Sequence, residues 1–96
     1  MAYDPGAIDA ALSAAVGDEP ALIAELRRAF LDGATRAVQA MRAAPSDDEW
    51  RSAATRLRGL AASFGAVRLM ALAASAAEGS RDGAMAAKLE RAVARL

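Results

Sequence analysis

Apolar residues recur every three or four positions along most of the chain, and this period is typical of amphipathic helices. The longest such pattern runs from Asp18 to Met41. We predict one long helix there, capped by Asp18 and with Pro20 in its first turn. Leu31 and Val38 flank the apolar stripe, which indicates contact with more than one neighbouring helix. The positions predicted to face the core are Leu22, Ile23, Leu26, Phe30, Gly33, Ala37 and Met41.

Shorter periodic stretches predict three further helices after the long one and a short helix before it. The short first helix is expected over about Pro5 to Ala15. The others are expected over about Asp47 to Phe64, Ala66 to Ala77 and Asp82 to Leu96, with Asp82 as the cap of the last helix. Within the helix over 66–77, the candidate core positions are Val67, Leu69, Met70, Leu72, Ala73 and Ala76.

Capping residues and turn residues mark the predicted helix ends. The Ala-Pro pair at 44–45 ends the long helix, because the residue before a proline disfavours helical geometry. Ser46 and Glu49 have the spacing of a capping box, in which each side chain bonds the other residue's main-chain amide. Gly65 and Gly79 follow periodic stretches, where helix C-terminal glycines are common.

Composition supports an all-α fold. Alanine, the strongest helix former, makes up about 30% of the chain, whereas valine, isoleucine and aromatic residues are scarce. The short loops between the predicted helices favour antiparallel neighbours. We therefore expect an up-and-down antiparallel four-helix bundle with a short extra N-terminal helix. The 96 residues suffice for a single domain, with a bundle core over about residues 18 to 96.

Charge and residue chemistry narrow the function. Twelve basic and twelve acidic side chains balance, so we expect neither nucleic acid nor a membrane as a partner. The chain has no cysteine and no histidine, so we expect no metal and no cofactor. Its start lacks the features of a signal peptide, and no uncharged run approaches the length that spans a bilayer. We expect a cytoplasmic protein.

The segment from Thr55 to Leu69 carries the most specific pattern of the chain. Its residues with defined spacing are Leu57, Gly59, Phe64, Gly65, Ala66 and Leu69. The pattern resembles the signature of histidine-containing phosphotransfer (HPt) domains: His-x-Leu-Lys-Gly-Ser, then an apolar residue, Gly-Ala and Leu. The resemblance covers about residues 18 to 94 and implies the same four-helix fold. It also implies a role in two-component signalling, with a receiver domain or a histidine kinase as the partner.

The phosphorylatable histidine of that pattern falls on Thr55, and no other histidine is present. Phosphorelay needs a high-energy phosphohistidine, whereas a threonine phosphate ester would trap the phosphoryl group. Threonine also needs a base to act as a nucleophile, and no such base is evident beside it. We therefore expect no enzymatic activity. A phosphotransfer protein with an unusual acceptor is the alternative.

A helical wheel at about 100° per residue separates two faces of the helix over 47–64. The buried stripe is expected to contain Trp50, Ala53, Leu57, Leu60, Ala61 and Phe64. The opposite face is expected to be exposed, with small residues edged by arginines. It forms the candidate partner-binding surface, whose residues are Arg51, Ser52, Thr55, Arg58, Gly59 and Ala62.

Gly59 has two interpretations. A glycine within a helix costs about 1 kcal/mol relative to alanine, which this chain uses freely. Either bulk is excluded there so that a partner approaches closely, or the glycine reflects drift or close packing against a neighbouring helix. Arg58 stands where the family usually has lysine, and its charge suits an acidic partner pocket.

Two hypotheses for the function follow. The first is a non-catalytic, HPt-like module that docks a receiver domain or a histidine kinase through this face. The adjoining surface of the long helix would contribute Arg28, Asp32, Arg36 and Gln39. The second is a four-helix structural or oligomerisation module that keeps only the fold. We expect a monomer, with a weak homodimer as the alternative.

Overall fold

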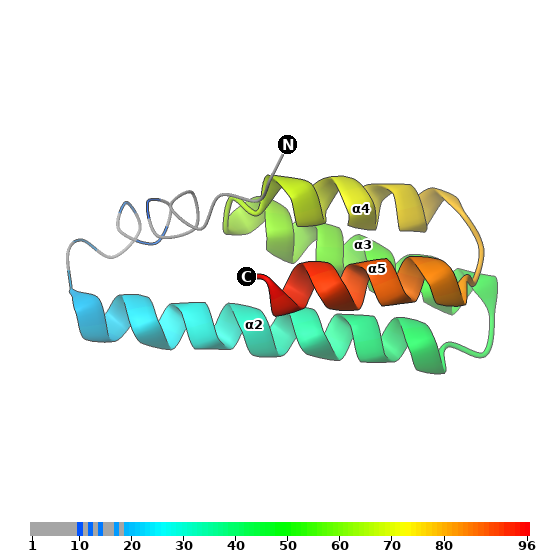
Figure 1. The fold of residues 1–96 in the computed structure, drawn as a ribbon, viewed down its shortest axis with the longest axis horizontal. Helices are drawn as coiled ribbons and strands as arrows, with labels where there is room; N and C mark the ends of the chain where they lie inside the picture. Colours follow the sequence, from blue (N-terminus) through cyan, green and yellow to red (C-terminus); the bar gives the residue numbers. More distant parts are fainter. Residues whose placement is uncertain (1–9, 11, 13, 15–16, 18) are drawn as a thin grey trace.

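The computed structural model describes residues 10, 12, 14, 17 and 19–96. This part of the chain forms α-helices and contains no strand (Figure 1). The short helix expected over about Pro5 to Ala15 lies, for the most part, outside the described residues. The bounds of the other four are α2 (Pro20–Ala43), α3 (Asp47–Ser63), α4 (Val67–Glu78) and α5 (Gly83–Ala94), close to those predicted.

Each of these four helices packs against two others. Helix α2 contacts α3 and α5, and α4 contacts the same two helices, so the described elements close a ring. Figure 1 shows them lying side by side along the long dimension of the molecule. The fold is therefore a helical bundle in which α5 lies across the core from α3.

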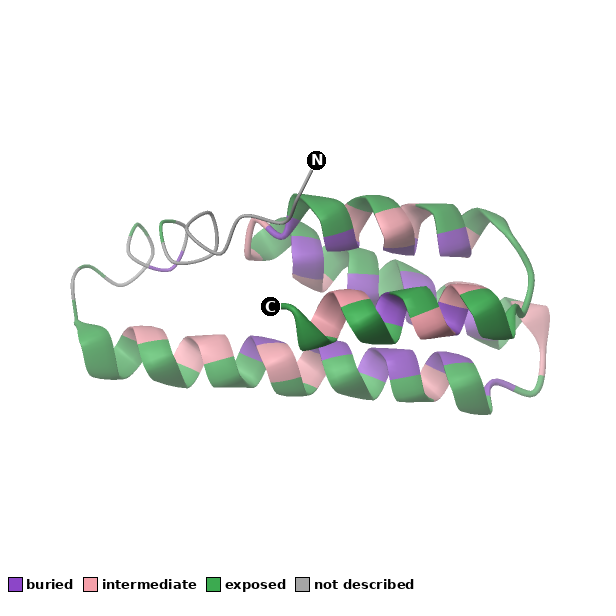
Figure 2. Ribbon diagram, viewed as in Figure 1, coloured by how far each residue is buried: buried purple, intermediate pink, exposed green. Residues whose placement is uncertain are grey.

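The core contains a few large side chains set among alanines. Alanines such as Ala34, Ala54 and Ala73 are completely buried. Small side chains at a contact let helix axes approach closely. Because each alanine buries little apolar area, the large residues supply most of it. Figure 2 shows the buried positions facing inward along all four helices. The largest fully buried side chains are Trp50, Phe30, Met41, Leu57, Leu69 and Leu89.

Two residues predicted to be buried are exposed. Val67 is 66% exposed, because residues two apart on a helix point about 160° away from each other and Leu69 occupies the core. Leu22 is 40% exposed. It belongs to the first turn of α2, whose early turns are largely exposed (Figure 2), and the first buried residue of this helix is Phe30.

The helix N-termini follow the predicted caps in two of three cases. The Ser46 hydroxyl accepts a hydrogen bond from the Glu49 amide (3.2 Å), although the return bond of a capping box is not formed. The Asp82 carboxylate accepts from two amides in the first turn of α5. The prediction for α2 is wrong by one residue. Glu19, and not Asp18, is the N-cap, and its side chain makes no capping bond.

The glycines after α3 and α4 act differently. Gly65 has a φ of 71°, in the left-handed region that favours glycine. The amide of Ala66 bonds the Ala61 carbonyl (2.9 Å) and that of Gly65 bonds the Ala62 carbonyl (3.3 Å), which is a Schellman motif. Gly79 also ends its helix as predicted, but its φ of −103° is accessible to any residue.

Two ion pairs join segments that are distant in the sequence. Arg42 of α2 lies 2.5 Å from the Glu90 carboxylate of α5. The Asp47 carboxylate accepts from the Arg81 amide (3.0 Å) and guanidinium (3.4 Å), which ties the start of α3 to the loop before α5. The hydrogen bond from Arg42 holds the pKa of Glu90 below its usual value. That from the Arg81 amide does the same for the pKa of Asp47.

These lowered carboxyl pKa values predict a small loss of stability in acid. The stabilisation is present above the unfolded pKa values, about 4, and is lost as the pH falls through the lower folded values. We expect the urea midpoint of the wild type to exceed that of Asp47→Asn/Glu90→Gln at neutral pH, and the difference to shrink as the pH falls below about 4. Arg81→Gln should keep part of the midpoint gap over the double variant, because the main-chain amide of residue 81 still donates to Asp47. A midpoint gap independent of pH would contradict this assignment.

Candidate functional site

The candidate surface lies along the outer side of α3, and its exposure agrees with the helical wheel. Thr55, near the middle of the helix, is exposed. So are Ser52, Arg58, Gly59 and Ala62, whereas Arg51 is half-buried. The residues share this side because Trp50, Leu57 and Ala61 bury the opposite side in the core.

The edge of the buried stripe of α3 faces α2. Leu60 and Phe64, predicted to be buried, are only partly so and pack against the rim of the core. A β-carbon added at Gly33 of α2 would lie 3.3 Å from Leu60 Cδ1. Gly33 therefore makes room for Leu60, and this contact identifies the side of α2 that adjoins α3.

Gly59 has open space around it. A β-carbon added there would meet nothing within 4 Å beyond the adjacent backbone of its own helix. Close packing against a neighbouring helix, one of the alternative explanations for this glycine, is therefore contradicted. The fold would accept alanine at residue 59 without a clash, and the glycine leaves a shallow, uncrowded strip one turn beyond Thr55.

A pair of alanine substitutions tests this difference between the two glycines. Gly59→Ala is expected to raise the free energy of unfolding by about 0.5–1 kcal/mol, because alanine has the higher helix propensity and meets no neighbour. Gly33→Ala should raise the free energy of unfolding by less than this, or lower it, because the added methyl group presses on Leu60. Urea unfolding of both variants measures the effect. A larger gain at residue 33 than at residue 59 would refute the packing described here.

Arg51 does not contribute the free positive charge that the sequence suggested. Its guanidinium lies 2.6 Å from the Asp48 carboxylate and donates to the Gly79 carbonyl (3.4 Å). It therefore links the first turns of α3 to the end of α4. The positive edge of the surface depends instead on Arg58, which is exposed and forms no ion pair or hydrogen bond with a described residue.

The Thr55 hydroxyl lies on the exposed side of α3. No hydrogen bond joins this side chain to another described residue. Nor does the described chain contain any group of three acidic side chains placed to hold a metal ion. Asp47, Asp48 and Glu49 occupy the first turn of α3, where acids suit the helix dipole. Among the described residues, those around Thr55 on the outer side of α3 form an exposed surface.

Ser63 is a residue of this surface that the wheel analysis missed. Its hydroxyl donates to the Gly59 carbonyl (3.0 Å), four residues earlier. Serine often forms this bond within helices, so the signal was present in the sequence. The bond fixes the exposed Ser63 side chain against α3 beside the open strip at Gly59.

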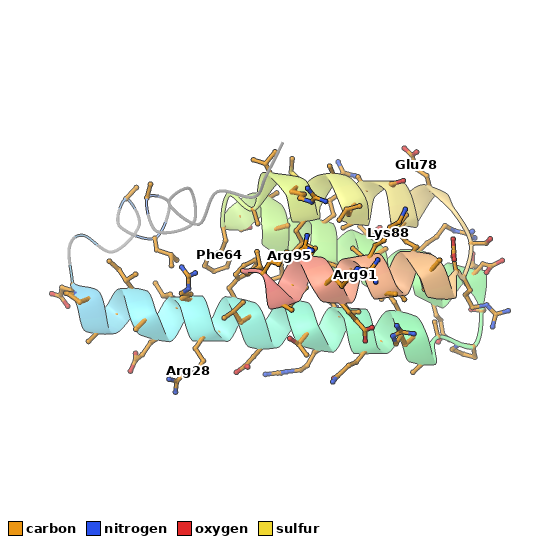
Figure 3. The ribbon with its side chains drawn as sticks, viewed as in Figure 1. Arg28, Phe64, Glu78, Lys88, Arg91 and Arg95 are labelled. Atoms are coloured by element: carbon orange, nitrogen blue, oxygen red, sulfur yellow. The ribbon has the colours of Figure 1, made fainter. Side chains whose placement is uncertain are left out.

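The residues proposed to contribute from α2 are all exposed but do not all face α3. Arg36 lies about 60° from Gly33 on the helical wheel, toward the α3 side. Figure 3 shows Arg28 pointing away from the other helices. Gln39 lines a groove between α2 and α5. The adjoining part of α2 is therefore limited to Arg36 and, at its margin, Asp32.

Comparison of the chain with protein-family models, with curated proteins and with solved structures found no match. Among the helices of the described chain, none combines the length and the apolar character required to cross a membrane.

Proposed function

We propose that this protein is a non-catalytic, HPt-like module of two-component signalling. It docks the receiver domain of a response regulator, or a histidine kinase, through the outer face of α3. The pattern from Thr55 to Leu69, which resembles the HPt signature, supports a receiver domain or a histidine kinase as the partner. The fold that goes with this proposal is the up-and-down antiparallel bundle. The short connections and the order of the colours along successive helices in Figure 1 support it.

The observation that carries the proposal is the open space at Gly59. This glycine lowers helix stability and makes no close contact within the bundle. A partner that lies flat on α3 would benefit, because a side chain at residue 59 would hold it away from Thr55. The exposed Arg58, which has no ion pair among the described residues, adds a positive charge beside the strip, and this charge complements the acidic pocket typical of receiver domains.

The partner would meet a threonine where a true phosphotransfer domain offers histidine. Since no described residue bonds the Thr55 hydroxyl as a base, the module would bind without taking the phosphoryl group. It would thus sequester a regulator or shield its aspartyl phosphate. Such an effect needs affinity alone, and a surface of small, exposed residues can supply it.

The test is an amide-shift NMR titration of the labelled protein with receiver domains from the same cell, with and without beryllofluoride. Shifts should cluster at Ser52, Thr55, Arg58, Gly59 and Ala62. Gly59→Arg should raise the dissociation constant at least about tenfold, since its side chain covers the strip. No shift with any receiver or kinase would refute the proposal.

Ala71→Arg is the matched control, because Ala71 is an exposed small residue on the outer side of α4. It adds the same bulk and charge elsewhere on the bundle, and we expect receiver binding to stay within about twofold of the wild type. Equal losses from both variants would show that charge, and not the α3 surface, controls binding.

The same small residues favour one other role, a homodimer in which two α3 faces pack together. Ala62 is exposed on this face, and helices approach closely where small residues meet. Sedimentation over a range of concentrations tests this. A dimer that Ala62→Arg dissociates would favour the structural module, whereas a monomer at high concentration would exclude it.

A further inference from the structure

A second surface lies between α4 and α5, and the charged residues that line it are all positive. A groove of about 290 Å³ lies there, lined by Arg68, Leu72, Lys88, Arg91, Ala92 and Arg95. Four of these six residues are cations, none is acidic, and the chain as a whole has no net charge. Figure 3 shows Lys88, Arg91 and Arg95 following one another along α5. The groove therefore concentrates a third of the twelve basic residues of the chain.

The cations of α5 differ from the paired arginines of the bundle, although Arg91 attracts the neighbouring Glu90 carboxylate and helps to lower its pKa. The side chains of Lys88, Arg91 and Arg95 form no hydrogen bond or ion pair with a described residue. The acid next to Arg91 is Glu90, whose carboxylate is already bonded to Arg42 across the α2–α5 contact. This differs from Arg42, Arg51 and Arg81, each of which is paired with an acid.

Helix electrostatics explain only part of the groove. Cations in the last turn of α5 interact favourably with the helix dipole, which accounts for Arg91 and Arg95. Lys88 lies nearer the middle of that helix, where the helix dipole contributes little. Like charges three and four residues apart also repel each other. An acidic ligand would relieve this repulsion.

We propose that the α4–α5 groove binds an acidic amphipathic helix of a partner protein. The cations at 88, 91 and 95 extend over about 10 Å of α5, or two helical turns. Acidic side chains at three- and four-residue spacing match that length, and arginine pairs well with carboxylates. Leu72 and Ala92 give the groove an apolar part, which a short apolar stripe between the acids would cover.

Two other anionic partners fit the surface less well. Leu22 and Val67 are the large apolar residues exposed on the described chain, and neither lines the groove, so no apolar anchor for a membrane accompanies the charges. A nucleic acid would extend beyond so short a groove, across a protein with as many acids as bases.

This inference does not rest on the proposed function. Helix α5 lies across the core from α3, and α3 has no residue in the groove. The two surfaces can therefore be occupied or disabled separately.

The test measures fluorescence polarisation of a labelled helical peptide of about four turns, with glutamates on both sides of a Leu and Ala stripe. We expect the wild-type protein to bind this peptide, to bind it more weakly as NaCl is added, and not to bind the same peptide with Gln in place of Glu. Arg91→Glu/Arg95→Glu should raise the dissociation constant at least about tenfold. Lys88→Gln/Arg91→Gln, which places no acid at the end of α5, should raise it severalfold.

Arg28→Glu/Arg36→Glu is the matched control, because it makes the same charge change on exposed positions of α2. It should leave peptide affinity within about twofold. Failure of the wild type to bind, equal binding of the Gln peptide, or an equal loss in the control would overturn the proposal. So would binding of a DNA duplex or of phosphatidylglycerol vesicles at the groove without binding of the peptide. Receiver titrations of Arg91→Glu/Arg95→Glu separate this result from the α3 surface, since they should be unchanged.

Discussion

Trp50→Ala is expected to lower the free energy of unfolding by about 3–5 kcal/mol. The indole is only 2% exposed and is the largest fully buried side chain. Its Nε1 donates to the Ala76 carbonyl (3.0 Å), so it joins α3 to α4 by a hydrogen bond as well as by packing. Because domains of this size are stable by about 5–15 kcal/mol, the loss would be a large part of the total.

Thermal and urea unfolding followed by circular dichroism would measure the change, and the melting temperature should fall by more than about 10 °C. Trp50→Phe is the control that keeps most of the apolar volume and removes only the N–H donor. It should lose less, since the Ala76 carbonyl still accepts from the Gly79 amide (3.2 Å). Equal losses for the two substitutions would contradict the packing role of the indole.

Phe30→Ala is expected to have a similar effect, again about 3–5 kcal/mol. Phe30 is 1% exposed, and its ring stacks on Phe64 with the centroids 4.7 Å apart. Phe64 is the C-cap residue of α3, directly before the turn at Gly65. The pair therefore joins the middle of α2 to the end of the helix that carries the candidate surface.

A double-mutant cycle separates the ring contact from the cavity that each deletion leaves. Phe64→Ala alone should cost less than Phe30→Ala, because Phe64 is only partly buried. The coupling energy between the two should be about 0.5–1.5 kcal/mol. Additive effects within about 0.3 kcal/mol would show that the stacked geometry contributes nothing beyond burial.

The bounds of the four described helices and most of their caps could be predicted because those signals are local. Ser46 and Asp82 act on amides within three residues of themselves, and Gly65 adopts its left-handed turn directly after α3. Periodicity also separates the two sides of α3, so the burial of Leu57 and the exposure of Thr55 follow from the wheel.

The features that could not be predicted from the sequence are those that depend on which helices are neighbours in the bundle. Val67 fits the composition of a core, but its register on α4 directs it to solvent. Arg51 looked like a free surface charge, yet its partners include the carbonyl of Gly79, on another helix end. The pattern of Lys88, Arg91 and Arg95 is visible along α5, whereas the addition of Arg68 requires α4 to be its neighbour.

The position of the candidate surface on α3 could be predicted, but whether its glycine is open or packed could not. A wheel places Gly59 on the outer side of α3, but it cannot distinguish an open position from one filled by a neighbouring helix. The contrast with Gly33, which accommodates Leu60, comes from the packing of α2 on α3. The bond from the Ser63 hydroxyl to the Gly59 carbonyl is different, because it lies within α3 and its spacing of four residues can be read from the sequence.

The buried Trp50 gives this protein an intrinsic optical probe. It is the sole tryptophan of the chain, so the emission excited near the red edge of protein absorption comes from one known place. Its ring is shielded from water, and its N–H is bonded to the last turns of α4. Any event that separates α4 from α3 should shift the emission to longer wavelength. Ligands that occupy the α3 surface or the α4–α5 groove while leaving this contact intact should leave the emission wavelength of Trp50 unchanged.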